Sequence, residues 1–156
     1  MESITGLKGK SNAEIAEKLN QLLANYEVYY QNLRGFHWNI KGNDFFVLHE
    51  KFEELYNDAQ LAIDEVAERI LTLGEQPLHT YSDFVETSTI KEYKNLSDSK
   101  STVEALLESL RILIALEREI LSLAGDADDE GTLALMSEYL SAQEKTVWMF
   151  ASFLNK

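Results

Sequence analysis

The positions of the residues that break helices constrain this chain more than any other feature. Its 156 residues include one proline, Pro77, and seven glycines. Glycine and proline are the residues that most often end or bend a helix. The glycines leave several long stretches uninterrupted: they lie at Gly6, Gly9, Gly35, Gly42, Gly74, Gly125 and Gly131. The sequence therefore favours a few long helices over many short elements.

Apolar residues recur at the helical period in four segments, and each segment has a start signal. Ser11 and Ser101 each open a Ser-x-x-Glu capping box, whose side chains satisfy backbone N–H groups of the first turn. Asn43 or Asp44 can cap the second segment, and the fourth begins near Asp129. The expected helices cover approximately residues 11–42, 43–74, 101–125 and 129–153.

The connections between these helices predict the topology. Short loops join the first helix to the second and the third to the fourth, whereas residues 74–100 separate the middle two. So long a connection lets the second and third helices run in the same direction. We therefore expect an all-α, ferritin-like four-helix bundle whose long crossover carries a short helix at about residues 82–87. Residues 11–156 should form this single domain, preceded by a flexible leader, residues 1–10.

Composition excludes several classes of function. Asp and Glu outnumber Lys and Arg by 27 to 14, so the formal net charge is −13, which repels phosphate backbones and attracts cations. DNA binding should be absent or weak, since only Lys8 and Lys10 make the leader basic. The lack of cysteine excludes disulfides and thiolate ligands. No apolar run reaches the length of a membrane span or of a signal peptide, so we expect a cytoplasmic protein.

One face of the second expected helix carries side chains that can bind a metal. At about 100° per residue, four of them share an arc of about 100°: His49, Glu53, Asp64 and Glu68. Nitrogen and oxygen donors of these kinds suit iron, manganese or zinc. In so acidic a chain, however, one pair of charges four residues apart is weak evidence for a site. Glu65 and Arg69, for example, are expected to form only a surface ion pair.

A second copy of the chain could complete the site. Glu53 and Asp64 lie about 16 Å apart along the helix, too far to share one ion. Two copies could cross antiparallel about a two-fold axis near Asp58 or Ala59. His49 and Glu53 of one copy would then face Asp64 and Glu68 of the other. His37 would reach in from the first helix. No Glu stands three residues before any histidine, so the Glu-x-x-His pattern of a site within one bundle is absent, and His79 is expected in a loop.

Three segments carry a more specific pattern: residues 36–42 (FHWNIKG), 45–56 (FFVLHEKFEELY) and 64–69 (DEVAER). This pattern resembles that of the Dps family, the DNA-binding proteins from starved cells. The resemblance implies a hollow shell of twelve subunits, built from isologous dimers, with ferroxidase centres at the two-fold interfaces. It implies that His37 and His49 of one subunit and Asp64 and Glu68 of its neighbour bind iron. Glu53 stands where many members have Asp and would be a further ligand.

The same resemblance implies an iron-storing and iron-detoxifying miniferritin. Such a ferroxidase oxidises Fe²⁺, with hydrogen peroxide as the expected oxidant, stores ferric mineral and protects against oxidative stress. Trp38 would either trap oxidising equivalents near the centre or pack as an anchor between helices. Asp129, with Glu130 or Glu138, is a candidate for lining a three-fold pore. Two alternatives are a shell that mainly compacts DNA and a helical interaction module without metal.

Overall fold

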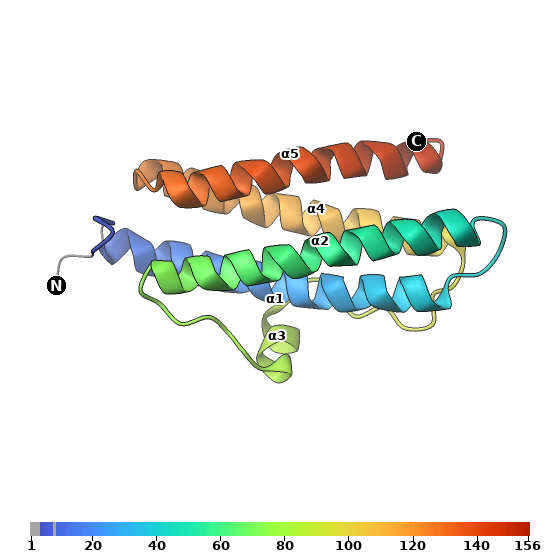
Figure 1. Cartoon of the computed structure of the whole chain (residues 1–156), viewed down its shortest axis with the longest axis horizontal. Helices are drawn as coiled ribbons and strands as arrows, with labels where there is room; N and C mark the ends of the chain where they lie inside the picture. The colour runs from blue at the N-terminus through green and yellow to red at the C-terminus, as the bar shows by residue number, and fades with distance from the viewer. Residues whose placement is uncertain (1–3, 8) are drawn as a thin grey trace.

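The computed structural model describes residues 4–7 and 9–156, and these residues form helices and connecting segments without strands (Figure 1). The helices are α1 (Gly9–Asn39), α2 (Phe45–Thr72), α3 (Tyr81–Thr87), α4 (Ser99–Asp126) and α5 (Glu130–Phe153). The expected all-α bundle with a short helix in its crossover is confirmed. Residues 1–3 and 8 of the expected leader lie outside the described residues, whereas Gly9 and Lys10 belong to α1.

The four long helices run side by side, and α3 lies below α1 in the crossover (Figure 1). Helix α1 packs against α2, α3 and α4, and α4 packs against α5. All four long helices contribute fully buried apolar side chains to one core, among them Leu19, Phe52, Leu113 and Met136. Within the described part of the chain, none of the helices combines the length and apolar character needed to cross a membrane.

Two helices begin two residues earlier than the capping boxes predict. Helix α1 begins at Gly9 rather than Ser11. Helix α4 begins at Ser99, because Asp98 is its N-cap and accepts a hydrogen bond from the backbone N–H of Ser101 at 2.8 Å. The Ser101 hydroxyl also donates to Asp98. Ser101 therefore lies within the first turn and does not cap it.

The start predicted for α5 near Asp129 is confirmed, and Asp129 is its N-cap, whereas Asp44 does not cap α2 with its side chain. Asp129 accepts from the backbone N–H of Thr132 at 3.0 Å. Asp44 is the N-cap residue of α2, yet its side chain makes no cap hydrogen bond. It accepts instead from the Ser99 hydroxyl at 2.7 Å, which ties the start of α2 to the start of α4.

Three asparagines of α1 hold the crossover in place. Their side-chain oxygens accept from backbone N–H groups of the crossover, at 2.8 Å for Leu78 to Asn20, 2.9 Å for Ile90 to Asn25 and 3.0 Å for Tyr93 to Asn32. These bonds satisfy main-chain groups that have no helical partner. The long connection is consequently fixed along α1 at three levels.

Candidate metal centre

The two histidines predicted as ligands lie against each other where α1 meets α2. The rings of His37 and His49 stack with centroids 3.8 Å apart and planes 12° apart. His37 Nδ1 lies 2.6 Å from the His49 carbonyl oxygen, and His49 Nδ1 lies 2.7 Å from the His37 carbonyl oxygen. A carbonyl oxygen only accepts, so each Nδ1 must donate its proton. The lone pair left for a metal on each neutral ring is therefore on Nε2.

Aromatic side chains support both imidazoles. The Tyr56 ring meets His37 edge-on at 5.3 Å, and the Phe45 ring stacks on His49 at 4.9 Å. His37 is buried and His49 half-buried. The ring orientations are thus set by packing as well as by the two backbone hydrogen bonds, which is the kind of support that ligating histidines have in metal sites.

The described part of the chain does not bring the predicted ligands together as a complete set. Glu53, Asp64 and Glu68 are all exposed on α2. Among residues 4–7 and 9–156, no three side chains of the metal-binding types come together. The single chain therefore brings the two histidines together without assembling a full ligand set, and completion of the site by a second chain stays a prediction.

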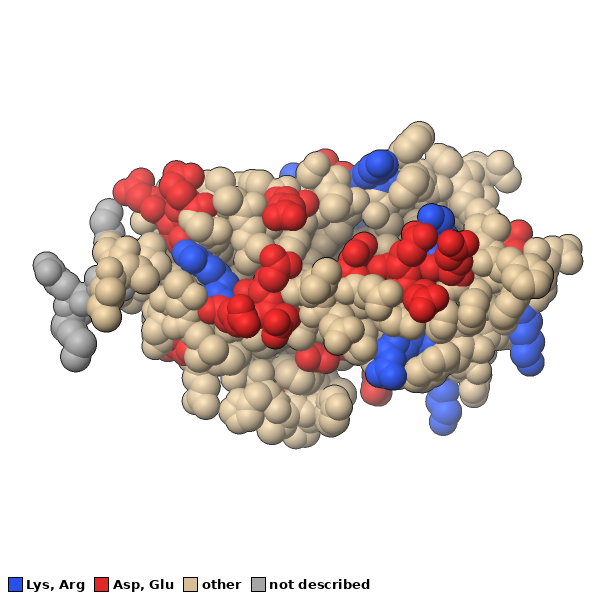
Figure 2. Space-filling view, in the orientation of Figure 1, with Lys and Arg blue, Asp and Glu red and all other residues tan. Residues whose placement is uncertain are grey.

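The outer face of α2 is both acidic and apolar. Figure 2 shows groups of acidic side chains on the face of the molecule where α2 lies in front. Phe46 and Leu61 on the same helix are 82% and 65% exposed. Ala59 is buried in the chain's own core, whereas Asp58 is exposed. Of the two residues predicted to lie near a two-fold axis, only Asp58 is on the outside.

Trp38 does not anchor helices within this chain. Its side chain is 57% exposed, and the Arg34 guanidinium lies 4.8 Å from its ring centroid. The anchor hypothesis is therefore wrong for the single chain. The hypothesis that Trp38 traps oxidising equivalents stays a prediction.

Arg69 makes a buried ion pair in place of the predicted surface pair with Glu65. Its Nη2 donates to Asp129 Oδ1 at 2.6 Å, and its Nε donates to the Thr132 hydroxyl at 2.9 Å. Glu65 instead accepts from the Tyr139 hydroxyl at 3.3 Å. A buried, bonded carboxylate outcompetes an exposed one four residues away because the low local dielectric strengthens the interaction. The contact fixes the end of α2 that carries Asp64 and Glu68 to the start of α5.

This ion pair also changes the expectation for a pore. Asp129 is 2% exposed and fully engaged by Arg69 and Thr132, so it does not line an opening as predicted. Glu130 and Glu138 are exposed, and their place in a pore stays a prediction.

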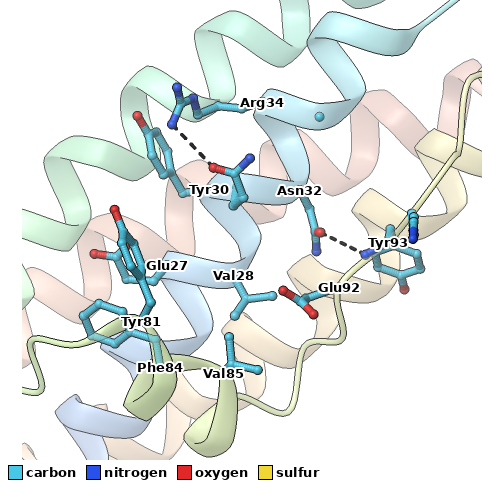
Figure 3. Close-up of a pocket in the computed structure, with 13 residues that line it drawn as sticks. Glu27, Val28, Tyr30, Asn32, Arg34, Tyr81, Phe84, Val85, Glu92 and Tyr93 are labelled. Carbon is cyan, nitrogen blue, oxygen red and sulfur yellow. Dashed lines mark hydrogen bonds between the residues drawn. The ribbon is translucent and has the colours of Figure 1, made fainter.

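A groove of about 500 Å³ lies between α1, α3 and the segment that follows α3 (Figure 3). Tyr81 and Phe84 form one side of it, and Asn32, bonded to Tyr93, lies on the other. Gly35 also lines it, and a Cβ there would meet nothing within 4 Å. Close packing within this chain therefore does not require glycine at position 35. No histidine lines this groove.

Sequence analysis missed a polar cluster inside the bundle. Glu117 of α4 is fully buried, and its Oε1 accepts from the Tyr26 hydroxyl at 2.6 Å and from Gln143 Nε2 at 2.9 Å. Burial raises the pKa of Glu117 to about 7. One signal was present, because Glu117 lies on the apolar stripe, four residues after Leu113 and three before Ile120. A charged residue on such a stripe is unusual and indicates a buried polar contact.

Comparison with known proteins agrees with the predicted family and fold. A family model for the ferritin-like domain matches residues 16–156. The DNA protection during starvation protein of Porphyromonas gingivalis is 47% identical over 153 residues, which cover 98% of this chain and 96% of that protein. The crystal structure of Dps from Vibrio cholerae O1, described as a member of a superfamily of ferritin-like diiron-carboxylate proteins, matches with a TM-score of 0.96. Its identity to this chain is 49%, and the match covers 99% of this chain and 98% of that one.

A more distant structure gives the same result. Dps from Bacillus brevis matches with a TM-score of 0.90 at 36% identity, over 95% of this chain and 99% of that one. The fold therefore agrees over nearly the whole length. The chain belongs to the Dps family of ferritin-like proteins.

Proposed function

We propose that this protein is an iron-storing and iron-detoxifying ferroxidase whose sites are completed by a second subunit. Membership of the Dps family supports a role in iron storage and protection. The observation that carries the proposal is the His37–His49 pair. Its two Nδ1 atoms are occupied by backbone carbonyls, which leaves both Nε2 atoms for a metal, and yet the described residues form no group of three metal-binding side chains.

In the proposed site, His37, His49 and Glu53 come from one subunit and Asp64 and Glu68 from its neighbour. The exposed acidic and apolar face of α2 supports this arrangement, because a surface of that kind suits burial against a second copy. An isologous pairing repeats each contact, so every dimer would hold two equivalent sites. The full assembly would be a closed shell of twelve subunits.

The donor set suits oxidation of Fe²⁺, which is the substrate. Carboxylates are hard anionic donors and stabilise Fe³⁺ more than Fe²⁺, while the two imidazoles contribute neutral nitrogen donors. Two Fe²⁺ ions supply the two electrons that hydrogen peroxide needs, and with two protons the peroxide becomes two waters. No hydroxyl radical is released when both electrons are delivered together. The ferric product would then collect as mineral inside the shell.

Protection would come from removal of iron and peroxide more than from a coat on DNA. The net charge of −13 on each chain opposes binding to a polyanion, and the shell would multiply that charge. We therefore propose a cytoplasmic protein that binds DNA weakly or not at all. A salt-sensitive gel shift that disappeared when residues 1–10 were removed would contradict this.

The first test measures iron oxidation directly. Fe²⁺ is added without oxygen to the assembled protein, hydrogen peroxide follows, and ferric absorbance is compared with a protein-free control. We expect fast, saturable oxidation that falls to the control rate in an Asp64→Asn/Glu68→Gln variant. A Glu14→Gln/Glu75→Gln variant removes two exposed carboxylates outside the proposed site and should keep the wild-type rate. Equal rates in the two variants would refute the ligand assignment.

A second test asks whether each site spans two chains. A His37→Ala/His49→Ala chain and an Asp64→Asn/Glu68→Gln chain are produced together with different tags, and shells carrying both tags are isolated. A mixed dimer has one intact site and one that lacks every ligand mutated in either chain. Random pairing should therefore restore about a quarter of the wild-type sites, although neither variant is active alone. No recovery in shells that contain both chains would exclude a shared site.

A further inference from the structure

The carboxylate of Glu117 has no role in the proposed iron site, and its surroundings are incomplete. Glu117 Oε2 and Gln143 Oε1 are buried without a hydrogen-bond partner. Both atoms belong to one cluster, because Gln143 Nε2 donates to the Tyr26 hydroxyl at 2.6 Å and to Glu117 Oε1 at 2.9 Å. Buried polar atoms without partners are rare in folded proteins, so these two call for an explanation.

Counting donors shows what is missing. Tyr26 has one O–H, which goes to Glu117. Gln143 has two N–H groups, which go to Tyr26 and to Glu117. Rotating the amide by 180° would place its oxygen against the Glu117 carboxylate, acceptor against acceptor. With Glu117 ionised, the cluster has therefore used all its donors, and the two remaining oxygens need a partner that is a donor or a cation.

The charge around the cluster favours a cation. A cavity of about 280 Å³ between α2 and α5 is lined by Tyr26 and Gln143, and both of these residues are hydrogen-bonded to Glu117, which does not itself line the cavity. Three carboxylates also line this cavity: Asp58, Glu65 and Glu138. Its described lining includes no Lys, Arg or His. Burial and the nearby Glu54 raise the pKa of Asp58. Negative charge is thus concentrated without a cationic side chain to balance it.

We propose that the bundle interior binds a divalent cation through Glu117 Oε2 and Gln143 Oε1, reached through the acidic cavity between α2 and α5. One amide oxygen and one carboxylate suit a cation that prefers oxygen, such as Mn²⁺, over one that prefers nitrogen or sulfur. The site differs from the proposed iron centre, because it lies within one chain and uses none of the same residues. Bundle cores are a usual place for such sites, since facing helices supply the ligands.

The test uses Mn²⁺ alone and a background in which the proposed interface ligands are removed. In assembled Asp64→Asn/Glu68→Gln protein, equilibrium dialysis and electron paramagnetic resonance should detect one Mn²⁺ per chain that survives repeated exchange. Adding Glu117→Gln should abolish that ion. Adding Glu119→Gln, which removes an exposed carboxylate from the same helix, should leave it bound. Retention of the same Mn²⁺ in the Glu117→Gln protein would overturn the proposal.

A second variant decides the question if Glu117→Gln does not assemble. Gln143→Glu adds a carboxylate where the cation would bind and should lower the Mn²⁺ dissociation constant at least about tenfold. Unchanged or weaker binding would mean that a water or a proton on Glu117 satisfies the two oxygens, and the proposal would fail. Neither readout uses iron oxidation, so failure here leaves the proposed ferroxidase function untouched, and the reverse also holds.

Discussion

Asp129 and Glu117 are both buried carboxylates, but only Asp129 has a cationic partner. Asp129 accepts from the Arg69 guanidinium at 2.6 Å and from the Thr132 backbone N–H at 3.0 Å. Glu117 accepts only from the neutral groups of Tyr26 and Gln143. The two sites therefore bury the same functional group in opposite electrostatic surroundings.

The difference follows from where each residue lies on its helix. Asp129 is the N-cap of α5, where unpaired backbone N–H groups and the helix dipole favour a negative charge. Glu117 is in the middle of α4, where every nearby backbone N–H is already used by the helix. A carboxylate at a helix start can be stabilised by the fold itself, whereas one in mid-helix must be balanced by a proton or by a bound ion.

Removing the paired carboxylate should have the largest effect on stability. Asp129→Ala leaves the Arg69 guanidinium without its partner and removes the cap of α5. We expect the free energy of unfolding to fall by about 3–5 kcal/mol, measured by urea denaturation followed by circular dichroism. Arg111→Ala, which breaks an exposed ion pair with Glu108, should cost no more than about 1 kcal/mol. Equal losses of unfolding free energy in both variants would show that the Arg69–Asp129 pair stabilises the protein no more than the exposed pair does.

The unpaired carboxylate should make stability depend on pH. The pKa of Glu117 is about 7 in the folded protein against an ordinary value of 4.5, so between these pH values the folded state holds a proton that the unfolded chain releases. Stability therefore falls as the pH rises from about 4.5 to 7 and stays lower above that range. The loss should be on the order of 3 kcal/mol.

The measurement compares wild type with Glu117→Gln in a chelating buffer from pH 5 to 8. The variant cannot ionise at this position, so the difference in unfolding free energy between the two proteins isolates the titration of Glu117. Wild type should lose stability relative to the variant as the pH rises. A constant difference over the whole range would mean that Glu117 does not titrate there.

The sequence was sufficient for the fold because the controlling signals are local. Helical periodicity, few breakers and one long connection define the bundle and its crossover without knowledge of any tertiary contact. The start of α4 was missed by two residues, since Asp98 and Ser101 are both good caps and only the folded geometry shows that Asp98 accepts the bond. Propensity does not separate two capping residues so close together.

The candidate site was predictable in part for the same reason. The proximity of His37 and His49 follows from a short connection between two antiparallel helices, and the structure brings them together. The partner of Arg69 was mispredicted, because Asp129 is 60 residues away and only tertiary packing makes it a nearer neighbour than Glu65. The proposed site takes Asp64 and Glu68 from a second chain, so the fold of one chain does not bring them to its own histidines.

Two glycines beside the α4–α5 turn give a smaller test of how tightly the Arg69–Asp129 pair is held. A Cβ at Gly131 would lie 2.8 Å from both terminal nitrogens of Arg69, whereas one at Gly125 would meet only Leu133 at 3.6 Å. An arginine end can usually move aside, but here movement would break its bonds to Asp129 and Thr132. Gly131→Ala should therefore destabilise the protein by about 1–3 kcal/mol, and Gly125→Ala, inside α4, should stabilise it by about 0.5–1 kcal/mol. A lower urea midpoint for Gly131→Ala together with a higher one for Gly125→Ala would show that the Arg69–Asp129 pair is held rigidly. An unchanged midpoint for Gly131→Ala would show that Arg69 can be displaced and that the pair contributes less to stability than its burial suggests.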